Sequence, residues 1–268
     1  MTFSFNRLGN LGHLGNQMFQ YAATKGLSVK HNRDFVIAPR EVFGQQYPTL
    51  RSSIDDCFSI TCNRGITSFP SHEERHFHFD KETFENPPEH DIDLVGFFQS
   101  EKWFKHIEKE IRNDFKFRPE YFDIASKSIE NLGNSAIGIH IRRTDFILNN
   151  NHVSQSMKYF EKSLEELPED SMVLIFSDDP EWCKNQQLFS SQRFLVSDTN
   201  NAYVDLCLMT LCKYIVMANS TYSWWGAYLS NAEKVIVPKT WNFDGNPNMD
   251  SSDLYCDGWI KYNNLCYN

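Results

Sequence analysis

Three stretches of this sequence combine side chains that could bind an anion or move a proton. The first is the block His140–Asp145, which reads HIRRTD. Because alternate side chains of a strand share a face, His140 and Arg142 should point the same way. A guanidinium can fork onto a phosphate through two charge-assisted hydrogen bonds, so Arg142 is the better candidate anion ligand. The alternative is a solvated arginine pair, Arg142 and Arg143, neutralised by Asp145 at a strand end.

The second stretch places three hydroxyl side chains directly after an apolar run. Residues 214–218 read YIVMA, and Ser220, Thr221 and Tyr222 follow at the expected start of a helix. The free N–H groups and the dipole of a helix N-terminus favour an anion, and hydroxyl groups add donors. Taken singly, Ser220 or Thr221 could equally be an ordinary N-cap.

The third stretch, residues 8–17, reads LGNLGHLGNQ and has a glycine at every third position. Glycines permit close backbone approach and positive φ. This spacing, however, matches neither the Gly-x-Gly-x-x-Gly pattern of dinucleotide-binding proteins nor the P-loop pattern, so both classes are disfavoured. His13 precedes the expected first helix, and Asn16 and Gln17 at its start could hold sugar or leaving-group oxygens.

Two groups of residues have metal-like spacing. Asp91 and Asp93 spell the Asp-x-Asp of metal-dependent glycosyltransferases. They precede an apolar strand instead of ending one, so we interpret them as surface charge. His72, His76 and His78 have a spacing that could suit zinc, but the neighbouring Glu and Arg residues favour an ordinary solvated segment. We therefore predict no metal site.

The elements that must position these residues are clearest in the second half of the chain. Short aliphatic runs alternate there with amphipathic segments of helical length, which indicates a Rossmann-like parallel sheet with crossover helices. Ligands of such sheets bind beyond the carboxyl ends of the strands. The expected strands are 136–141, 172–176, 193–196, 214–217 and 235–237, and the expected helices lie near 157–167, 180–187, 203–212 and 222–231.

The first half opens in the same way but is less regular, and its polar, aromatic-rich segment 40–88 shows no readable order of elements. Residues 116–133 connect the two patterns. We therefore expect two Rossmann-like domains facing a cleft, one of residues 1–125 and one of residues 126–268. The expected elements of the first domain are strands at 3–5, 35–38 and 94–98 and helices at 16–30 and 100–113.

Charge and composition narrow the classes of function. The 268 residues carry 26 Lys and Arg against 35 Asp and Glu, a net charge of −9. Because nucleic-acid binding relies on many cationic side chains, this balance argues against it, and any phosphate must be held locally. No apolar stretch reaches the roughly 20 residues that span a bilayer, no signal peptide is evident, and the seven cysteines fit reduced thiols. We expect a cytoplasmic protein, and the sequence indicates no oligomeric state.

Five blocks along nearly the whole chain resemble, in order and spacing, the α-1,2-fucosyltransferases of glycosyltransferase family 11, of bacterial or phage type. The resemblance implies a GT-B-like fold and an inverting transfer of L-fucose from GDP-β-L-fucose to the 2-hydroxyl of a galactose-terminated glycan. It also implies that no metal or other cofactor is required. The blocks are LGNQMFQYA at 14–22, GFFQSEK at 96–102, HIRRTD at 140–145, FSDDP at 176–180 and SWWGA at 223–227.

The resemblance also implies roles for particular residues. The first arginine of the HIRRTD block, Arg142, would bind the β-phosphate, and Asp205, which lies 15 positions before Ser220, would recognise guanine. A carboxylate suits guanine because the base presents two adjacent N–H donors. His140 would help to seat the base or ribose. Those expected to bind substrate are His140, Arg143, Asp178, Asp205, Ser220, Thr221, Tyr222 and Gln17, and the catalytic set is Arg142, Asp145, Asn16 and His13.

The general base remains open at this point. Asp145 is a carboxylate in the right block, but the adjacent arginines favour its ionised form and make it a weak base, so it more readily orients them. His13 and Glu101 are alternatives. Two positions depart from the family pattern: His13 stands where arginine is usual, and Phe146 where tyrosine is usual. A transferase for another GDP-sugar, such as GDP-mannose, and a non-catalytic sugar-nucleotide-binding or glycan-binding protein are the competing interpretations.

Overall fold

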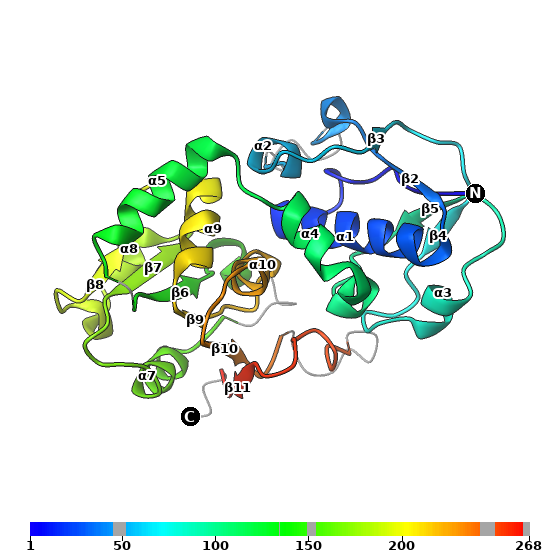
Figure 1. Ribbon diagram of the computed structural model, residues 1–268. Coiled ribbons are helices and arrows are strands. Elements are labelled where there is room, and N and C mark those ends of the chain that lie inside the picture. Colours follow the sequence, from blue (N-terminus) through cyan, green and yellow to red (C-terminus); the bar gives the residue numbers. More distant parts are fainter. Residues whose placement is uncertain (45–51, 134, 149–153, 242–249, 265–268) are drawn as a thin grey trace. The chain divides into compact units, whose positions relative to one another are not determined.

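The computed structural model describes residues 1–44, 52–133, 135–148, 154–241 and 250–264, and it divides the chain into two compact α/β units (Figure 1). The first unit ends at Arg118, seven residues before the boundary expected from the sequence. The difference arises because helix α5 (Pro119–Glu130) packs along α9 (Ala202–Leu211) in the second unit. Residues 250–255 belong to the first unit, where the Asp253 carboxylate accepts a hydrogen bond from Phe79 N.

The first unit contains a five-stranded parallel sheet in the order β3-β2-β1-β5-β4. Helix and strand patterns in the sequence located the central elements of this sheet, whereas β3, β4 and the short α2 and α3 fall in the segment that had no readable order. The strands are β1 (Thr2–Phe5), β2 (Asp34–Ile37), β3 (Asn63–Arg64), β4 (Ser71–Glu73) and β5 (Ile92–Val95), and the helices are α1 (Leu14–His31), α2 (Ile54–Cys57), α3 (Lys81–Glu85) and α4 (Glu108–Asp114).

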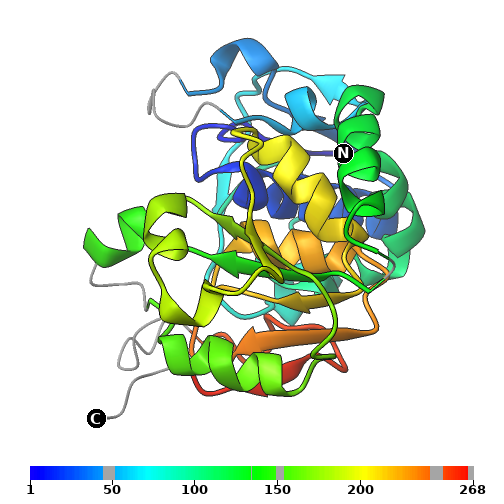
Figure 2. The same ribbon diagram turned by 90° about the vertical axis from the view of Figure 1, so that its left-hand side faces the viewer.

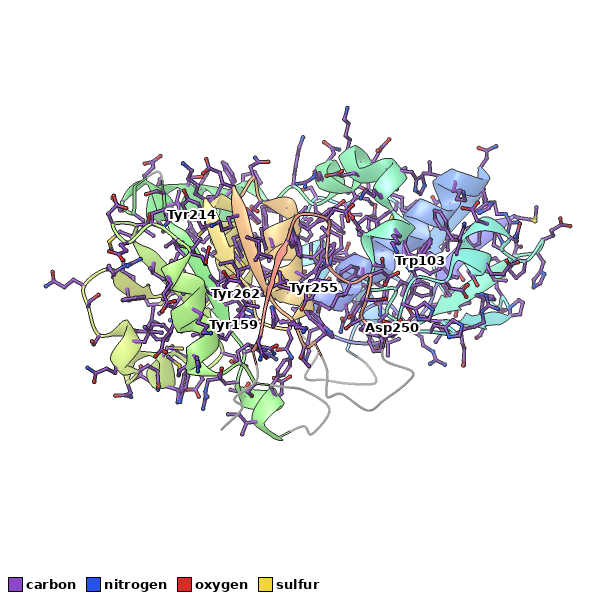
Figure 3. The ribbon with its side chains drawn as sticks, turned by 90° about the horizontal axis from the view of Figure 1, so that it is seen from below. Trp103, Tyr159, Tyr214, Asp250, Tyr255 and Tyr262 are labelled. Carbon is purple, nitrogen blue, oxygen red and sulfur yellow. The ribbon has the colours of Figure 1, made fainter. Side chains whose placement is uncertain are left out.

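Two expected elements of the first unit differ from those observed. The strand expected at 94–98 begins two residues earlier, at Ile92, and ends at Val95. The helix expected at 100–113 is instead two short 3₁₀ turns, η2 (Glu101–Trp103) and η3 (Lys105–Ile107), followed by α4. Trp103, labelled in Figure 3, is buried there with edge-on contacts to the rings of Phe79 and Phe98, and this aromatic packing interrupts the helical path.

The interpretation of Asp93 as surface charge is wrong. Asp93 lies within β5 and is only 5% exposed. Its carboxylate accepts hydrogen bonds from Ser4 Oγ and Asn6 N of the neighbouring strand β1 and its end, at 2.9 and 2.8 Å. A buried carboxylate needs such donors, so Asp93 joins two strands. Asp91 accepts a hydrogen bond from Thr2 N at the beginning of β1.

The second unit contains a six-stranded parallel sheet in the order β11-β10-β9-β6-β7-β8. The five strands expected from the sequence are confirmed, and β11 was not foreseen. The strands are β6 (Ile137–Ile141), β7 (Val173–Ser177), β8 (Phe194–Val196), β9 (Tyr214–Val216), β10 (Lys234–Pro238) and β11 (Ile260–Tyr262), and the further helices are α6 (Thr144–Leu148), α7 (Met157–Glu165), α8 (Pro180–Lys184) and α10 (Thr221–Leu229).

Helices cover both faces of this second sheet, with α5 and α9 on one side and α7 on the other (Figures 1 and 2). Ile137, Ile139 and Ile141 face the α7 side, in one hydrophobic cluster with Tyr159 and Phe160. Gly138, by contrast, lies against Cys212 of the α9 side. The predicted alternation along β6 is therefore confirmed.

The residues that follow β9 form the other face of the core. Trp224 and Trp225 of α10 are fully buried and pack edge-on against each other, as expected of core residues. Tyr159, labelled in Figure 3, sends its hydroxyl to Met217 O at 2.8 Å, which ties α7 to the end of β9. Within the described residues, no helix is long and apolar enough to cross a membrane.

Candidate active site

The carboxyl end of β6 carries an arginine held between two carboxylates. Arg142 donates through Nε and Nη2 to the two oxygens of Asp145, at 2.8 and 3.0 Å, and its Nε lies 3.2 Å from Asp178 Oδ2. Its Nη1 donates no hydrogen bond to any described residue. Asp145 thus binds the Nε–Nη2 edge of the guanidinium. The Nη1–Nη2 edge still presents two N–H donors in the arrangement that binds a phosphate.

Asp178, at the end of the neighbouring strand β7, organises the turn that carries Arg142. Its Oδ1 accepts from Arg143 N at 2.9 Å, and its Oδ2 accepts from Thr144 N at 3.2 Å and from the Thr144 hydroxyl. The carboxylate therefore caps the first turn of α6 from another strand. With these bonds and the Arg142 contact, Asp178 faces the protein, so its position suits holding the arginine more than contacting a substrate.

Arg143 occupies a different environment from Arg142. Its Nε donates to Asp179 Oδ2 at 3.2 Å, and its guanidinium carbon lies 3.6 Å from the ring centroid of Trp182. Asp179 also caps α8 by accepting from Trp182 N. These contacts make Arg143 a packing element between β6 and α8 in this conformation. The stacking on Trp182 distinguishes Arg143 from Arg142, whose guanidinium lies between two carboxylates at the strand ends.

His140 is buried on the opposite face of β6 from the isoleucines. It is 5% exposed, and its ring centroid lies 5.4 Å from that of Tyr222. Burial, together with the positive charge of Arg142, lowers the pKa of His140 to about 3, so the imidazole is neutral at physiological pH. Its Nδ1 is buried and finds no hydrogen-bond partner within the described ranges. A neutral ring can accept or donate one hydrogen bond there, which fits a ligand hydroxyl or base.

The N-terminus of α10 follows β9, which pairs directly with β6. Ser220 occupies the N-cap position without using its side chain as a cap, and both Ser220 and Thr221 are partly exposed. Tyr222 is turned away from this end: its hydroxyl donates to Ala202 O at the start of α9. The hydroxyls of Ser220 and Thr221 and the first N–H groups of a nine-residue helix thus remain the donors for an anion.

Asp205 lies in the first turn of α9. A single oxygen, Oδ1, accepts hydrogen bonds from the hydroxyls of Ser197 and Thr199, at 2.6 and 2.7 Å. Burial raises the pKa of Asp205 above its usual value. The hydrogen bonds from Ser197 and Thr199 oppose this rise only in part. The two hydroxyls orient the carboxylate and leave Oδ2 able to accept from a further donor.

The first unit brings a second set of polar side chains to the carboxyl ends of its strands. His13 is exposed at the N-cap position of α1, and Asn16 follows in the first turn. Gly12 has φ +85°, and a Cβ on it would lie 2.2 Å from Asn16 Nδ2, so only glycine leaves room for this amide. Asn16 Oδ1 accepts from Gln99 Nε2 at 2.9 Å, which joins the glycine-rich turn to the loop after β5.

Gln17 does not reach a ligand in this conformation. Its side chain is fully buried, its Nε2 donates to Ser52 O at 2.9 Å, and its Oε1 accepts from Ile54 N. Both ends of the amide are therefore engaged by the backbone before α2. The expected sugar contact of Gln17 therefore has no support in this geometry. Adjacent residues of a helix face different directions, so Gln17 is buried while Asn16 is partly exposed.

Sequence reasoning missed the residues that shape the loop after β5. Glu74, just beyond β4, accepts hydrogen bonds from Phe97 N and Phe98 N, both at 2.8 Å. Gln20 Nε2 donates to Leu11 O and Gly96 O, which ties the same loop to the glycine-rich turn. The GFFQ run was a signal for Gln99, but nothing local marked Glu74. Glu101, a candidate base, pairs with Lys105 at 2.8 Å.

The departures from the family pattern also have a structural setting. Phe146 is 8% exposed, and the Arg142 guanidinium carbon lies 5.9 Å from its ring centroid. A phenylalanine keeps this cation–π contact without the hydroxyl of a tyrosine. Within the described part of the chain, no group of three or more His, Cys, Asp or Glu side chains is placed to hold a metal ion.

Two Rossmann-like units with polar side chains beyond their strand ends define a GT-B-like glycosyltransferase. The model of the family described as Glycosyl transferase family 11 matches residues 4–263, so the chain belongs to this family. The family resemblance seen in the five sequence blocks is thereby confirmed.

Individual proteins agree with this assignment. The chain is 28% identical to an α-1,2-colitosyltransferase of Escherichia coli, over 93% of this chain and 96% of the relative. It is 25% identical to galactoside α-(1,2)-fucosyltransferase 1 of Ateles belzebuth, over 84% of this chain and 65% of the relative. The crystal structure of the fucosyltransferase NodZ from Bradyrhizobium matches with a TM-score of 0.54 and 14% identity, over 85% of this chain and 93% of that chain, which establishes the fold.

Proposed function

We propose that this family 11 enzyme transfers L-fucose from GDP-β-L-fucose to the 2-hydroxyl of a galactoside, with inversion to an α-1,2 linkage. The observation that carries the proposal is the position of Arg142. It lies at the end of β6, while the uncapped N-terminus of α10 follows the adjacent strand β9. Two features that bind anions thus meet at one edge of one sheet.

The reaction makes its largest new charge on the leaving diphosphate. The acceptor hydroxyl attacks the anomeric carbon from the side opposite GDP, the bond from that carbon to the β-phosphate oxygen breaks, and the acceptor proton leaves to a base. Arg142 would bind the developing phosphate charge through its Nη1–Nη2 edge, and Ser220 and Thr221 would add hydroxyl and N–H donors. Preorganised donors of this kind stabilise the transition state most strongly.

The remaining donor contacts follow from the same edge. Asp205 would accept the N1–H and N2–H donors of guanine, because its carboxylate is already oriented by Ser197 and Thr199. His140, neutral and with a buried ring nitrogen to satisfy, would bond the base or ribose. Asn16 of the first unit would hold a sugar or leaving-group oxygen, and Asp145 would orient Arg142.

We propose that the transfer needs no metal ion. Arg142 and the helix N-terminus are the charges that take the place of a divalent cation at the diphosphate. The direct test is fucosyl transfer with and without EDTA. Equal rates support the proposal, and a rate that EDTA abolishes and Mn²⁺ or Mg²⁺ restores would overturn it.

A second donor has a specific observation in its favour. The relative that matches over 93% of this chain is named an α-1,2-colitosyltransferase. Colitose differs from L-fucose by lacking the 3-hydroxyl. A site that hydrogen-bonds this hydroxyl should reject the deoxy sugar by a factor of about 10⁴ or more, whereas an apolar site tolerates both. The ratio of kcat/KM for GDP-fucose and GDP-colitose therefore decides between them.

The test of function uses the whole chain with each GDP-sugar and a panel of galactosides. Product linkage is determined by NMR, and GDP release is measured in parallel. We expect GDP release only with a galactoside and a 2-linked product. Binding of GDP-sugar without any transfer would instead support a non-catalytic binding protein, and transfer from GDP-mannose alone would indicate another transferase.

A further inference from the structure

The half-buried carboxylate of Glu74 holds the loop after β5, in addition to the Gln20 amide, which bonds Gly96 O. Glu74 N donates to Val95 O at 2.8 Å, so the residue continues the pairing of β4 with β5 by one position. Its Oε2 accepts from Phe97 N and its Oε1 from Phe98 N, both at 2.8 Å. One side chain thus binds two successive backbone N–H groups of a loop that belongs to another part of the sequence.

The loop needs this restraint because its backbone is unusual. Phe98 has φ +53°, a left-handed conformation that costs a bulky residue free energy and persists only when the surroundings impose it. Its ring is fully buried beside Phe5 and Trp103. Gly96 makes the approach possible, since a Cβ there would lie 2.4 Å from Glu74 Cβ. Carboxylate, glycine and aromatic packing together set one conformation for residues 96–99.

This conformation delivers the next side chain, Gln99, to Asn16. Gln99 is 7% exposed and donates through Nε2 to Asn16 Oδ1 at 2.9 Å. Its Oε1 is buried and accepts no hydrogen bond from the residues that the structure describes. Asn16 Oδ1 is therefore engaged by Gln99, which turns the Asn16 amide and aims its Nδ2 as a donor.

We propose that Glu74 is a positioning residue for sugar transfer: its ionised carboxylate holds the 96–99 loop so that Gln99 aims the Asn16 amide at an oxygen of the sugar or leaving group. The inference rests on the proposed function, since Asn16 has a ligand only if the chain binds a sugar nucleotide. Glu74 itself touches no reacting atom in this scheme.

The charge of Glu74 is sensitive to pH near neutrality. Burial raises its pKa to about 7, against the lowering effect of the Phe97 and Phe98 amides. The charged group that acts on it from the N-cap of α3 is Asp80, which also raises the pKa of Glu74 and is itself paired with Arg75 through two hydrogen bonds. On its own strand, Glu73 is exposed. Protonation below pH 7 removes the charge from both hydrogen bonds and loosens the loop, so transfer should rise as the pH rises through about 7.

The variant Glu74→Gln tests this relay, with Glu73→Gln as the matched control. Glutamine can accept only one of the two N–H groups and points its own NH₂ at the other. Hydrogen bonds to a charged group contribute about tenfold to a hundredfold in an equilibrium constant. We expect kcat at pH 8 to fall by about that factor in Glu74→Gln, with little change in the KM of the donor, and the rise of kcat through pH 7 to disappear. Glu73→Gln should keep both the rate and the profile.

Hydrogen exchange separates this inference from the proposed function. At pH 8 the Phe97 and Phe98 amides should be protected in the wild type and in Glu73→Gln and exposed in Glu74→Gln, with the remaining protection unchanged as evidence of folding. Active wild type together with an equally active, equally pH-dependent Glu74→Gln overturns the positioning role. A wild type that transfers no sugar would refute the proposed function instead. In that case hydrogen exchange still tests the inference, because unchanged exchange of the Phe97 and Phe98 amides in Glu74→Gln would show that Glu74 does not hold the loop.

Discussion

The two units build their ligand-facing edges from different chemistry on the same kind of parallel sheet. The edge of the second unit is charged: Arg142 lies between Asp145 and Asp178, and Asp205 stands at the start of a neighbouring helix. The corresponding edge of the first unit carries amides, with Asn16 bonded to Gln99 beside a glycine-rich turn, next to the exposed imidazole of His13. In each, the side chains lie where parallel strands end.

The difference indicates a division of tasks. A chain with a net charge of −9 repels a diphosphate at long range, so the cation must be concentrated where the phosphate binds. The second unit supplies it with one well-oriented guanidinium and a helix N-terminus. Amides in the first unit suit neutral hydroxyls and ring oxygens, which need direction but little charge. If this division is correct, variants of the two edges should differ in both the size and the kind of their effects.

The largest effect is expected for Arg142→Ala. Loss of one preorganised group at a developing oxyanion typically lowers kcat by about 10²–10³, and we expect a loss of that size with a folded protein. The measurement is kcat for transfer from GDP-fucose, with circular dichroism as the check on folding. Arg193→Ala is the matched control, because Arg193 binds Ser171 O and Pro168 O at the other end of the sheet. Near-normal transfer by folded Arg142→Ala would remove the basis of the comparison.

Asp178→Asn should have the next largest effect. The substitution keeps the shape but points an NH₂ group at the N–H and O–H donors of Arg143 and Thr144, which now bond to the Asp178 carboxylate. A hydrogen bond to a charged group contributes about 1.5–3 kcal/mol. We expect kcat/KM to fall by about tenfold to a hundredfold, together with a lower melting temperature, because the turn that carries Arg142 is released. Asp170→Asn, an exposed aspartate at the opposite end of the unit, is the control. A variant that loses stability but keeps full activity would assign Asp178 to folding alone.

Asn16→Ala probes the amide edge and should have a smaller effect. One neutral hydrogen bond contributes about 0.5–1.5 kcal/mol, or roughly a factor of ten at most. We expect a loss of about that size in kcat, without the large loss predicted for Arg142. Asn86→Ala, which removes an exposed amide of the same unit, should leave the kinetics unchanged. Unchanged kinetics in Asn16→Ala would refute its contact with the substrate, and a loss as large as that of Arg142→Ala would erase the difference between the edges.

Much of the second unit could be predicted from the sequence. Its central strands β6, β7, β9 and β10 are short aliphatic runs that are mostly buried, and the helix caps are residues that prefer such positions, including Ser156 and Asn201. The alternation along β6 correctly separated Ile139 from His140. These features are local, so the sequence carries them directly.

The first unit was predicted less well because its contacts are remote in sequence. In the sequence Asp93 looks like surface charge, because only the fold brings β1 and its end beside this residue to supply two hydrogen-bond donors. Gln17 and Asn16 are adjacent in sequence, and only the packing of residues 52–54 shows that Gln17 is engaged inside the unit. Glu74 lies in a polar segment with no regular pattern, and its partners are more than 20 residues away. A sequence motif reveals residues that recur in a pattern. The roles of Asp93, Gln17 and Glu74 depend instead on hydrogen-bond partners that other segments of the chain bring beside them.

The smallest effect is expected for Tyr222→Phe, which sharpens the comparison within the charged edge. The Tyr222 hydroxyl bonds Ala202 O, so it steadies the start of α9, the helix that carries Asp205, while its ring stays beside His140. Losing one hydrogen bond should cost about 1 kcal/mol, seen as a severalfold rise in the Kd for GDP with kcat unchanged.

Tyr159→Phe, which removes a buried hydroxyl bonded to Met217 O and Ile236 O, should lower stability by a similar amount and leave the Kd for GDP unchanged. Equal effects of the two variants on GDP affinity would mean that the hydroxyl of Tyr222 serves the fold alone. A loss of kcat in Tyr222→Phe would instead bring this side chain to the phosphates, as the sequence motif first suggested.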